Sequence, residues 1–240
     1  MLGCALMSRG YFADDETRAE RVQDLFNTIA PRYNLINDLQ SFWLHRYWKR
    51  RLVALANLNP DHRALDLCCG TGDVAFDLAA GGAEVTGMDF SRSMLKCAAE
   101  RNSDANVNFQ CGDALNTDLP DNNFDVVTMA YGLRNLSDFE GGLQEMYRVT
   151  KPSGRILVLD LGKPSFAPWR WLYFGYLKWI VPVFGQVFCR DAPAYAYMHE
   201  SLENYPAQDG VAKVMEELGC KEVNIHRILG SAMTINVGVK

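Results

Sequence analysis

The stretch Ala64-Leu-Asp-Leu-Cys-Cys-Gly-Thr-Gly-Asp-Val-Ala-Phe-Asp-Leu-Ala79 decides the predicted fold. Its first part, Ala64–Cys68, is apolar enough for a buried strand, and a helix is expected from Asp73. Gly70 and Gly72 lie between them, where glycine allows a sharp turn and lets a ligand approach the backbone. The unpaired N–H groups at the start of the helix would face that ligand. The stretch therefore predicts a nucleotide-binding turn between a strand and a helix.

The composition is that of one globular domain with an elaboration. The chain has 240 residues, of which 48% are hydrophobic and 22% charged, and both values are ordinary. The net charge of −5 gives no reason to expect nucleic acid as a partner. The seven cysteines form no C-x-x-C pair, which favours a reducing cytoplasm and no metal site. Met1–Met7 is too short for a signal peptide, and no run predicts a membrane span.

Beyond the quoted stretch, strands and helices alternate. The further predicted strands are Glu84–Asp89, Asn106–Gln110, Phe124–Met129, Arg155–Asp160, Lys221–Ile228 and Ala232–Lys240. Ser91 is expected to cap one intervening helix, and Ser137-Asp138-Phe139-Glu140 reads as a capping box for another. This alternation predicts a doubly wound α/β fold whose seven-stranded sheet is covered by helices on both faces.

The chain divides into four predicted segments. They are an N-terminal helical lid at 1–57, a nucleotide-binding core at 58–160, an aromatic insert at 161–206, and a helix with two strands at 207–240 that completes the sheet. The lid is expected to contain helices over 14–30 and 43–57, the second with a solvated basic face. The insert is rich in aromatic residues interleaved with Lys and Arg. It predicts either a helix pair packed on the core or a face resting on lipid.

Three features favour S-adenosylmethionine over a nicotinamide dinucleotide in the predicted site. The pattern Gly70-x-Gly72-x-x-Ala75, with Asp89 about twenty residues on to bind ribose hydroxyls, fits both ligands. However, Asp66 precedes the turn, where it could hold an ammonium group. Asp113 follows the third strand, where it could accept a hydrogen bond from adenine. The chain also ends in a strand pair rather than in a second nucleotide-binding half.

Five motifs together resemble those of the ubiquinone/menaquinone-biosynthesis C-methyltransferases. They are Tyr33-Asn-x-x-Asn37-Asp38-x-x-Ser41, His45-Arg46-x-Trp48-Lys49, Leu65-Asp66-Leu67-x-x-Gly70-Thr71-Gly72-Asp73, Tyr131-Gly132-Leu133-Arg134-Asn135 and Met146-Tyr147-Arg148-Val149-x-Lys151-Pro152. The resemblance runs from about Asp24 to Lys240. It implies an adenosylmethionine-dependent enzyme that methylates a ring carbon of a prenylated quinol, either demethylmenaquinol or the benzoquinol precursor of ubiquinol.

The resemblance also implies residues that bind the cofactor. Thr71, Asp89 with its neighbour Phe90, and the pair Asp113-Ala114 match cofactor-binding positions of the family. Some members have a serine after the fourth strand, where this chain has Ala130. That contact therefore depends on backbone groups here.

The expected chemistry needs a group that stabilises a phenolate. A quinol ring carbon is a weak nucleophile until the neighbouring hydroxyl loses its proton. Arg134 follows the fourth strand and stays protonated, so we expect it to stabilise the oxyanion. Asn135 is expected to orient the ring oxygen, and Tyr33 or His45 from the lid to relay the proton. Asp160, which ends the fifth strand, is open to a substrate contact or a capping role.

The expected partner is a prenylated quinol at the inner face of a membrane, with the chain bound peripherally in the cytoplasm. Trp169 and Trp171 of the insert are expected to contact lipid. A homodimer and an association with other quinone-biosynthesis enzymes are left open. The alternatives are a methyltransferase for another small phenolic or lipid acceptor, a NAD(P)-dependent oxidoreductase, and a non-catalytic lipid-binding protein.

Overall fold

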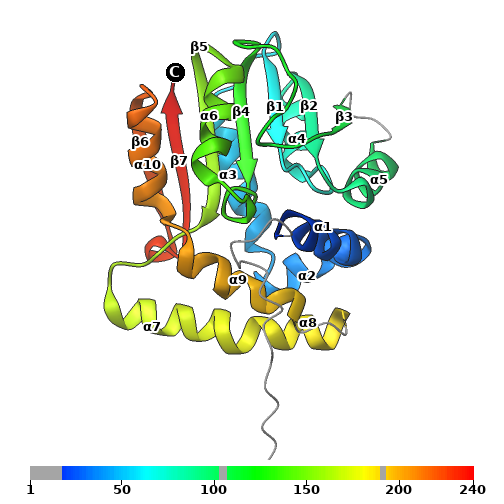
Figure 1. Ribbon diagram of the computed structural model, residues 1–240, viewed down its shortest axis with the longest axis vertical. Helices are drawn as coiled ribbons and strands as arrows, with labels where there is room; N and C mark the ends of the chain where they lie inside the picture. Colours follow the sequence, from blue (N-terminus) through cyan, green and yellow to red (C-terminus); the bar gives the residue numbers. More distant parts are fainter. Residues whose placement is uncertain (1–17, 103–106, 190–192) are drawn as a thin grey trace, which may run out of the picture.

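The computed structural model describes residues 18–102, 107–189 and 193–240. Its centre is a seven-stranded sheet in the order β3-β2-β1-β4-β5-β7-β6 (Figure 1). The strands are β1 Arg63–Leu67, β2 Glu84–Asp89, β3 Val107–Cys111, β4 Phe124–Ala130, β5 Thr150–Leu161, β6 Lys221–Ile228 and β7 Met233–Val239. The first five pair in parallel, and β7 runs antiparallel to both of its neighbours. This confirms the predicted doubly wound fold.

Helices cover the sheet and its carboxyl edge. They are α1 Arg18–Ile29, α2 Tyr33–Gln40, α3 Leu44–Ala56, α4 Asp73–Ala80, α5 Arg92–Arg101, α6 Phe139–Val149, α7 Ala167–Gly175, α8 Val181–Cys189, α9 Pro193–Asn204 and α10 Ala207–Glu217. Helix α3 packs against α4 and β5, and α10 packs against α6, β6 and β7. Helices α1, α2, α7, α8 and α9 gather beyond the ends of the parallel strands (Figure 1). The N-terminal segment is thus split, since α1 and α2 lie at this edge and α3 lies against the sheet.

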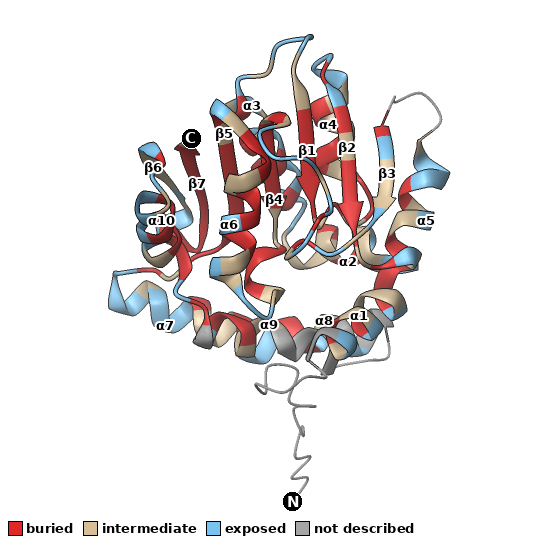
Figure 2. Ribbon diagram, turned by 45° about the horizontal axis from the view of Figure 1, so that its top comes forward, coloured by how far each residue is buried: buried red, intermediate tan, exposed pale blue. Residues whose placement is uncertain are grey.

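The central strands are buried on both sides because both faces carry helices (Figure 2). All residues from Ala64 to Leu67 are buried, and so are those from Val126 to Met129. One apolar cluster contains buried residues of the lid helices, the strands, the insert and α10. The carboxyl ends of β1, β2 and β4 are therefore held at fixed positions under α1 and α2.

Two local predictions need correction. The N-cap of α6 is Asp138, whose side chain accepts a hydrogen bond from the Gly141 N–H at 2.9 Å, so Ser137 does not cap this helix. Strand β5 begins at Thr150 rather than at Arg155. Thr150 already pairs with Phe124, and the register then shifts before Val126. The predicted helical residues 14–17 and the strand residue 106 lie outside the described residues.

The aromatic insert forms helices that pack on the core. Helix α7, the π-helical turn η3 at Tyr176–Ile180 and α8 follow one another without a break and form one long helix (Figure 1). Tyr173, Leu177 and Val181 face the core along it and are buried. Within the described ranges, no helix combines the length and the apolar character needed to cross a bilayer.

Candidate functional site: two cavities with a shared wall

The glycine turn is hydrogen-bonded to the end of β2. Gly70 has a φ of 54°, in the left-handed region that favours glycine. Its N–H donates to Asp89 Oδ2 at 2.8 Å, and the Ser91 N–H donates to Asp89 Oδ1 at 2.8 Å. Asp89 is buried, and burial raises the pKa of its carboxyl group above the usual value. The two backbone donors hold this carboxylate beside the turn.

A cavity of about 210 Å³ lies between this turn and the ends of β2, β3 and β4. Eight of the residues that the sequence predicts for the site line it: Tyr33, Gly70, Asp89, Phe90, Asp113, Ala114, Ala130 and Asn135. Helix α1 contributes Val22 and Phe26 to the opposite wall. We call this space the donor cavity. Its polar groups lie at the strand ends, where open α/β sheets bind nucleotides.

Helix α1 is hydrogen-bonded across the donor cavity. The Gln23 amide Nε2 donates to the Phe90 carbonyl oxygen at 2.8 Å. The Ser91 hydroxyl donates to Asn27 Oδ1 at 2.7 Å, while its oxygen also caps α5 by accepting from the Met94 N–H. These contacts hold α1 against the loop that follows β2.

Three predicted cofactor residues lie outside the donor cavity. The Thr71 hydroxyl is buried and donates to Asn34 Oδ1 of α2 at 2.8 Å. Gly72, with a φ of 85°, is the N-cap residue of α4 and packs under the rings of Phe76 and Phe109. Asp66 is buried in β1, where the Thr128 hydroxyl donates to it at 2.7 Å and burial raises its pKa to about 7. These three residues thus shape the turn and its surroundings.

A chain of ion pairs, buried at Lys49 and exposed at Arg101, lies beside the glycine turn. Lys49 Nζ is 2.8 Å from Asp73 Oδ2, and Arg101 Nη2 is 2.7 Å from Asp73 Oδ1. Burial would raise the pKa of Asp73, but the two cations outweigh it and lower the pKa to about 2. The expectation of a solvated basic face on α3 is therefore wrong for Lys49, which is buried and joins α3 to the start of α4.

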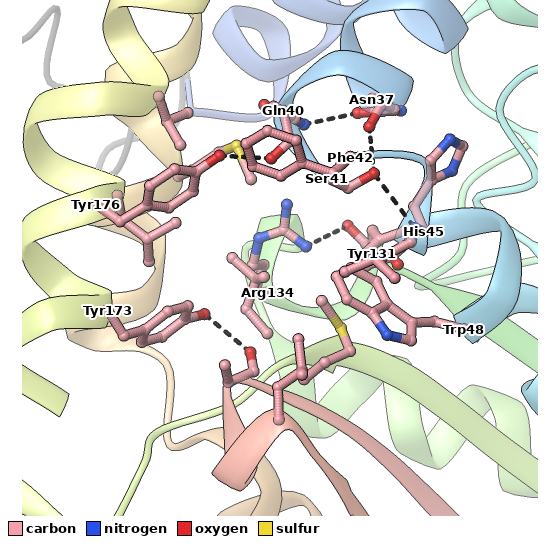
Figure 3. A pocket seen from close by; sticks show the side chains of 18 of the residues that line it. Asn37, Gln40, Ser41, Phe42, His45, Trp48, Tyr131, Arg134, Tyr173 and Tyr176 are labelled. Atoms are coloured by element: carbon pink, nitrogen blue, oxygen red, sulfur yellow. Dashed lines mark hydrogen bonds between the residues drawn. The ribbon is translucent and has the colours of Figure 1, made fainter. Parts of the chain in front are cut away.

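A second, larger cavity of about 460 Å³ lies between α2, α3 and the insert. Its walls are mainly apolar and aromatic, and Arg134 projects into it (Figure 3). Arg134 Nη1 is 2.5 Å from Asp160 Oδ1 and also donates to the Tyr131 carbonyl oxygen at 2.9 Å. Both charged side chains are 3% exposed. We call this space the acceptor cavity. Asp160 is the counter-ion of Arg134, and its Oδ2 also accepts the Arg134 backbone N–H at 3.3 Å.

His45 lies in the wall of the acceptor cavity with a carboxylate behind it. Its Nε2 is 2.8 Å from Asp38 Oδ1, and Arg46 binds the same carboxylate through Nε and Nη2 at 2.7 and 2.6 Å. Burial, followed by the nearby Lys49 charge, lowers the pKa of His45. The Nδ1 atom has no hydrogen-bond partner among the described residues. The imidazole is directed away from Arg134 (Figure 3), so no direct contact joins the two predicted catalytic groups.

Tyr33 and Tyr131 line both cavities and form their shared wall. Tyr131 was not selected from the sequence. It has a φ of 61°, which is unusual for an aromatic residue, and its carbonyl oxygen accepts from both Arg134 and the Asn135 side chain. Its hydroxyl is buried and makes no hydrogen bond within the part of the chain that the structure describes. The sequence signals that point to it are its place directly after β4 and its place at the start of the motif Tyr131-Gly132-Leu133-Arg134-Asn135.

The two tryptophans expected at a lipid surface differ. Trp171 is 80% exposed. Trp169 instead lines the acceptor cavity, and its Nε1–H donates to the Leu229 carbonyl oxygen at 2.8 Å. Trp169 is therefore a wall residue, and the expectation of a lipid contact stays only for Trp171.

The chain is similar in sequence to known methyltransferases over nearly its whole length. The chain is 37% identical to a demethylmenaquinone methyltransferase of Desulfitobacterium hafniense over 230 residues, covering 93% of this chain and 91% of the relative. It is 34% identical to a demethylmenaquinone methyltransferase of Staphylococcus aureus over 232 residues, covering 95% and 96%.

Solved structures with similar folds include an S-adenosylmethionine-dependent methyltransferase of Thermotoga maritima, described as a possible histamine N-methyltransferase. It has a TM-score of 0.65 at 20% identity and covers 90% of this chain and 99% of its own. The magnesium protoporphyrin IX methyltransferase of Synechocystis has a TM-score of 0.64 at 16% identity, with 95% and 97% covered. At these identities the likeness concerns the fold alone.

The sequence profile of the ubiE/COQ5 methyltransferase family matches residues 14–240. This match covers nearly the whole chain, including both cavities and the aromatic insert. The chain therefore belongs to the ubiE/COQ5 methyltransferase family and is an S-adenosylmethionine-dependent methyltransferase.

Proposed function

We propose that the chain transfers a methyl group from S-adenosylmethionine to a ring carbon of a prenylated quinol of the demethylmenaquinol class. The observation that carries this proposal is the pair of cavities. A cavity at the glycine turn, which carries the Asp89 and Asp113 carboxylates, and a larger, more apolar cavity share the wall formed by Tyr33 and Tyr131. A donor and an acceptor of very different polarity can therefore meet at one place. The benzoquinol precursor of ubiquinol is the second acceptor to test, because the same apolar walls suit it.

The donor cavity fits an adenosyl group. The Asp89 carboxylate, held by two backbone N–H groups, would accept hydrogen bonds from ribose hydroxyls. Asp113 lies at the end of β3, where its carboxylate would accept from the adenine amino group. A Cβ on Gly112 would come within 2.7 Å of the Met88 sulfur, so glycine keeps this floor open. When bound, the donor supplies a methyl group already activated on a sulfonium sulfur.

Arg134 is proposed to stabilise the acceptor as its phenolate. The guanidinium is fixed by Asp160 and by the Tyr131 carbonyl, so little reorganisation is needed when negative charge develops on the ring oxygen. Ion pairing with Asp160 also keeps the total charge of this buried site low before the acceptor ionises. Asn135 is bonded to the same carbonyl through Nδ2, which leaves its Oδ1 to orient a ligand.

Methyl transfer forms a bond from the ring carbon to the methyl carbon and breaks the bond from that methyl to sulfur. The acceptor hydroxyl gives up its proton first. After the transfer the ring carbon loses its hydrogen as a proton and the ring oxygen takes a proton back, so that one proton is released in total. Tyr33, in the shared wall, and His45, whose pKa is lowered by burial, are the proposed proton carriers. Because the His45 ring is turned away from Arg134, a water molecule would have to connect it to the acceptor.

The proposed acceptor has an apolar tail, so we expect the reaction to take place at a membrane surface. A prenyl tail is poorly soluble in water, and the acceptor cavity is lined chiefly by apolar and aromatic residues. We therefore propose that the chain works in the cytoplasm as a peripheral protein on the inner face of the membrane.

The test combines a purified assay with an analysis of cells. The protein is mixed with methyl-labelled S-adenosylmethionine and a short-tailed demethylmenaquinol in detergent, and the quinols are analysed by mass spectrometry. The expected product is one labelled methyl heavier, and cells lacking the protein should accumulate a quinone one methyl short. Methylation of other phenols but not of quinols would replace the proposed acceptor. Failure to bind S-adenosylhomocysteine would contradict the donor site.

A further inference from the structure

The mouth of the acceptor cavity is entirely apolar. Among the residues that line the cavity, four are exposed: Phe42, Leu44, Leu172 and Leu229. The polar lining residues, among them Arg134 and His45, are buried or partly buried. The opening is therefore formed by the turn between α2 and α3 on one side and by α7 and the short helical turn η4 (Leu229–Ser231) on the other. An acceptor entering here meets no charged group before it reaches the interior.

Exposed aromatic and aliphatic side chains continue from this mouth on both sides. Trp43 and Tyr47 follow Phe42 along the chain, and Trp171, Trp179, Ile180 and Val183 follow along α7, η3 and α8. We call these residues, with Phe42 and Leu172, the docking face. The outer side of the long helix thus carries large apolar side chains, and the exposed cations Arg170 and Lys178 lie among them. A surface helix of a protein surrounded by water normally has a polar outer side.

The two segments that form the docking face are also joined to each other. The Tyr176 hydroxyl in η3 donates to the Gln40 carbonyl oxygen, which directly precedes the α2–α3 turn, at 2.5 Å. A π-helical turn interrupts the regular helix at this place. Both sides of the mouth therefore form one connected structure.

The charges of these segments oppose the charge of the whole chain. Segments 39–51 and 161–189 contain no Asp or Glu, but they contain Arg46, Arg170 and Lys178 among other cations. The complete chain has 29 acidic and 24 basic residues. Arg170 and Lys178 are exposed, and Lys178 Nζ lies 5.6 Å from the ring centre of Trp179. Exposed aromatic residues next to cations suit the headgroup region of an anionic bilayer.

The backbone of the α2–α3 turn is a further reason to expect a ligand at the docking face. Phe42 and Trp43 have φ values of 50° and 62°, a conformation that costs free energy for bulky residues and suits glycine. Trp43 is also the N-cap residue of α3, and its side chain makes no capping hydrogen bond. More than half of the Trp43 surface is exposed. The fold thus gains little from this side chain, and a ligand outside the chain would explain its place.

We propose that the docking face binds the surface of an anionic lipid bilayer, with Trp43, Trp171 and Trp179 in the headgroup region and the mouth of the acceptor cavity turned toward the acyl chains. This inference rests on the proposed function, because it supplies a path by which a quinol head reaches Arg134 while its tail stays in lipid. It extends the lipid contact from the insert to the α2–α3 turn.

The test measures co-sedimentation of the full chain with vesicles of phosphatidylcholine alone or with one quarter phosphatidylglycerol. Wild-type protein should bind the anionic vesicles, and added salt should weaken binding. The Trp43→Gly/Trp171→Ser variant should bind at least tenfold more weakly. Trp43→Gly alone should keep or raise the melting temperature, since glycine suits its φ. A lower melting temperature would indicate that Trp43 supports the fold instead.

A charge-matched pair of variants tests the electrostatic part. Arg170→Ser/Lys178→Ser should weaken binding to anionic vesicles, and Lys96→Ser/Lys221→Ser, which removes two exposed cations elsewhere, should leave it unchanged. Equal loss in both pairs, or no vesicle binding by the wild type, would overturn the proposal.

Methylation of a water-soluble quinol without a tail separates this inference from the proposed function. Trp43→Gly/Trp171→Ser should methylate it at the wild-type rate, because neither residue lines the cavities. If the wild type fails to methylate the quinol but binds the vesicles, the proposed function fails and the docking face remains. If the docking face instead binds a soluble protein, the variant should bind vesicles as well as wild type does.

Discussion

Breaking the Arg134–Asp160 pair should cost both stability and activity. Both side chains are 3% exposed, so Asp160→Asn leaves a guanidinium charge buried without its counter-ion. Removal of one partner from such a pair lowers the free energy of unfolding by about 3–5 kcal/mol. This is a large part of the total for one domain, which is about 5–15 kcal/mol. At about 2–4 °C per kcal/mol for a chain of this length, the melting temperature should fall by about 6–20 °C. Urea and thermal unfolding measure this loss.

The double variant Arg134→Met/Asp160→Leu separates structure from chemistry. It removes both charges, so stability should recover by more than half of the loss. Full recovery is not expected, because the N–H groups of Arg134 and Leu161 also donate to Asp160. Methyl transfer should stay undetectable, since no cation remains to stabilise a phenolate. Methyl transfer by the double variant, or an unchanged melting temperature in Asp160→Asn, would refute the reasoning.

An exposed ion pair provides the matched control. Lys213 and Glu217 lie 3.4 Å apart on α10 with side chains that are 75% and 61% exposed. Solvent screens such a pair, so Glu217→Gln should change the free energy of unfolding by less than about 1 kcal/mol. Its methyl transfer should match that of the wild type, because α10 contributes to neither cavity.

Three further predictions concern the surroundings of the glycine turn. The pKa of Asp66 is raised to about 7 in the native state, so the native chain keeps a proton that the unfolded chain loses at lower pH. The free energy of unfolding should therefore fall as the pH rises toward 7. Asp66→Asn should make the free energy of unfolding, measured with urea, depend less on pH in this range. Gly132→Ala would place a Cβ 2.6 Å from the Cys68 Cβ and should lower the free energy of unfolding by about 1–3 kcal/mol. Adding Cys68→Gly should restore part of this stability. If it restores none, the contact with Cys68 is not the cause of the loss. Tyr131→Phe removes a buried hydroxyl that has no partner in the described residues and should raise stability by up to about 1 kcal/mol; a lower melting temperature of the ligand-free protein would contradict this.

The fold could be predicted because its signals are local. Gly70 marks the turn, and strand and helix periodicities follow it at short spacing, so the predicted strands β1, β2, β4 and β6 begin within one residue of the observed ones. The strand pair at the end of the chain was likewise visible as alternation. The predicted cofactor residues that line the donor cavity all lie at or just after the ends of strands, a position that the sequence reveals.

The rest depended on contacts between distant residues. Lys49 is buried with Asp73 as its counter-ion, which lies 24 residues further along the chain, and nothing near Lys49 in the sequence indicates this pairing. The sequence treats Trp169 and Trp171 alike, but two residues along a helix point in nearly opposite directions, so one lines a cavity and the other faces outward. The left-handed backbone of Tyr131 had no local signal at all, since glycine follows it rather than occupying its position.

The two hydrogen bonds that fasten α1 to the loop after β2 have a kinetic consequence. Val22 and Phe26 of this helix form one wall of the donor cavity, so a movement of α1 would widen the way out for a bound donor product. Opening must break the bonds from Gln23 to Phe90 and from Ser91 to Asn27 together. Release of the demethylated donor would then depend on the mobility of α1, and the turnover number can be limited by a movement far from the reacting carbon.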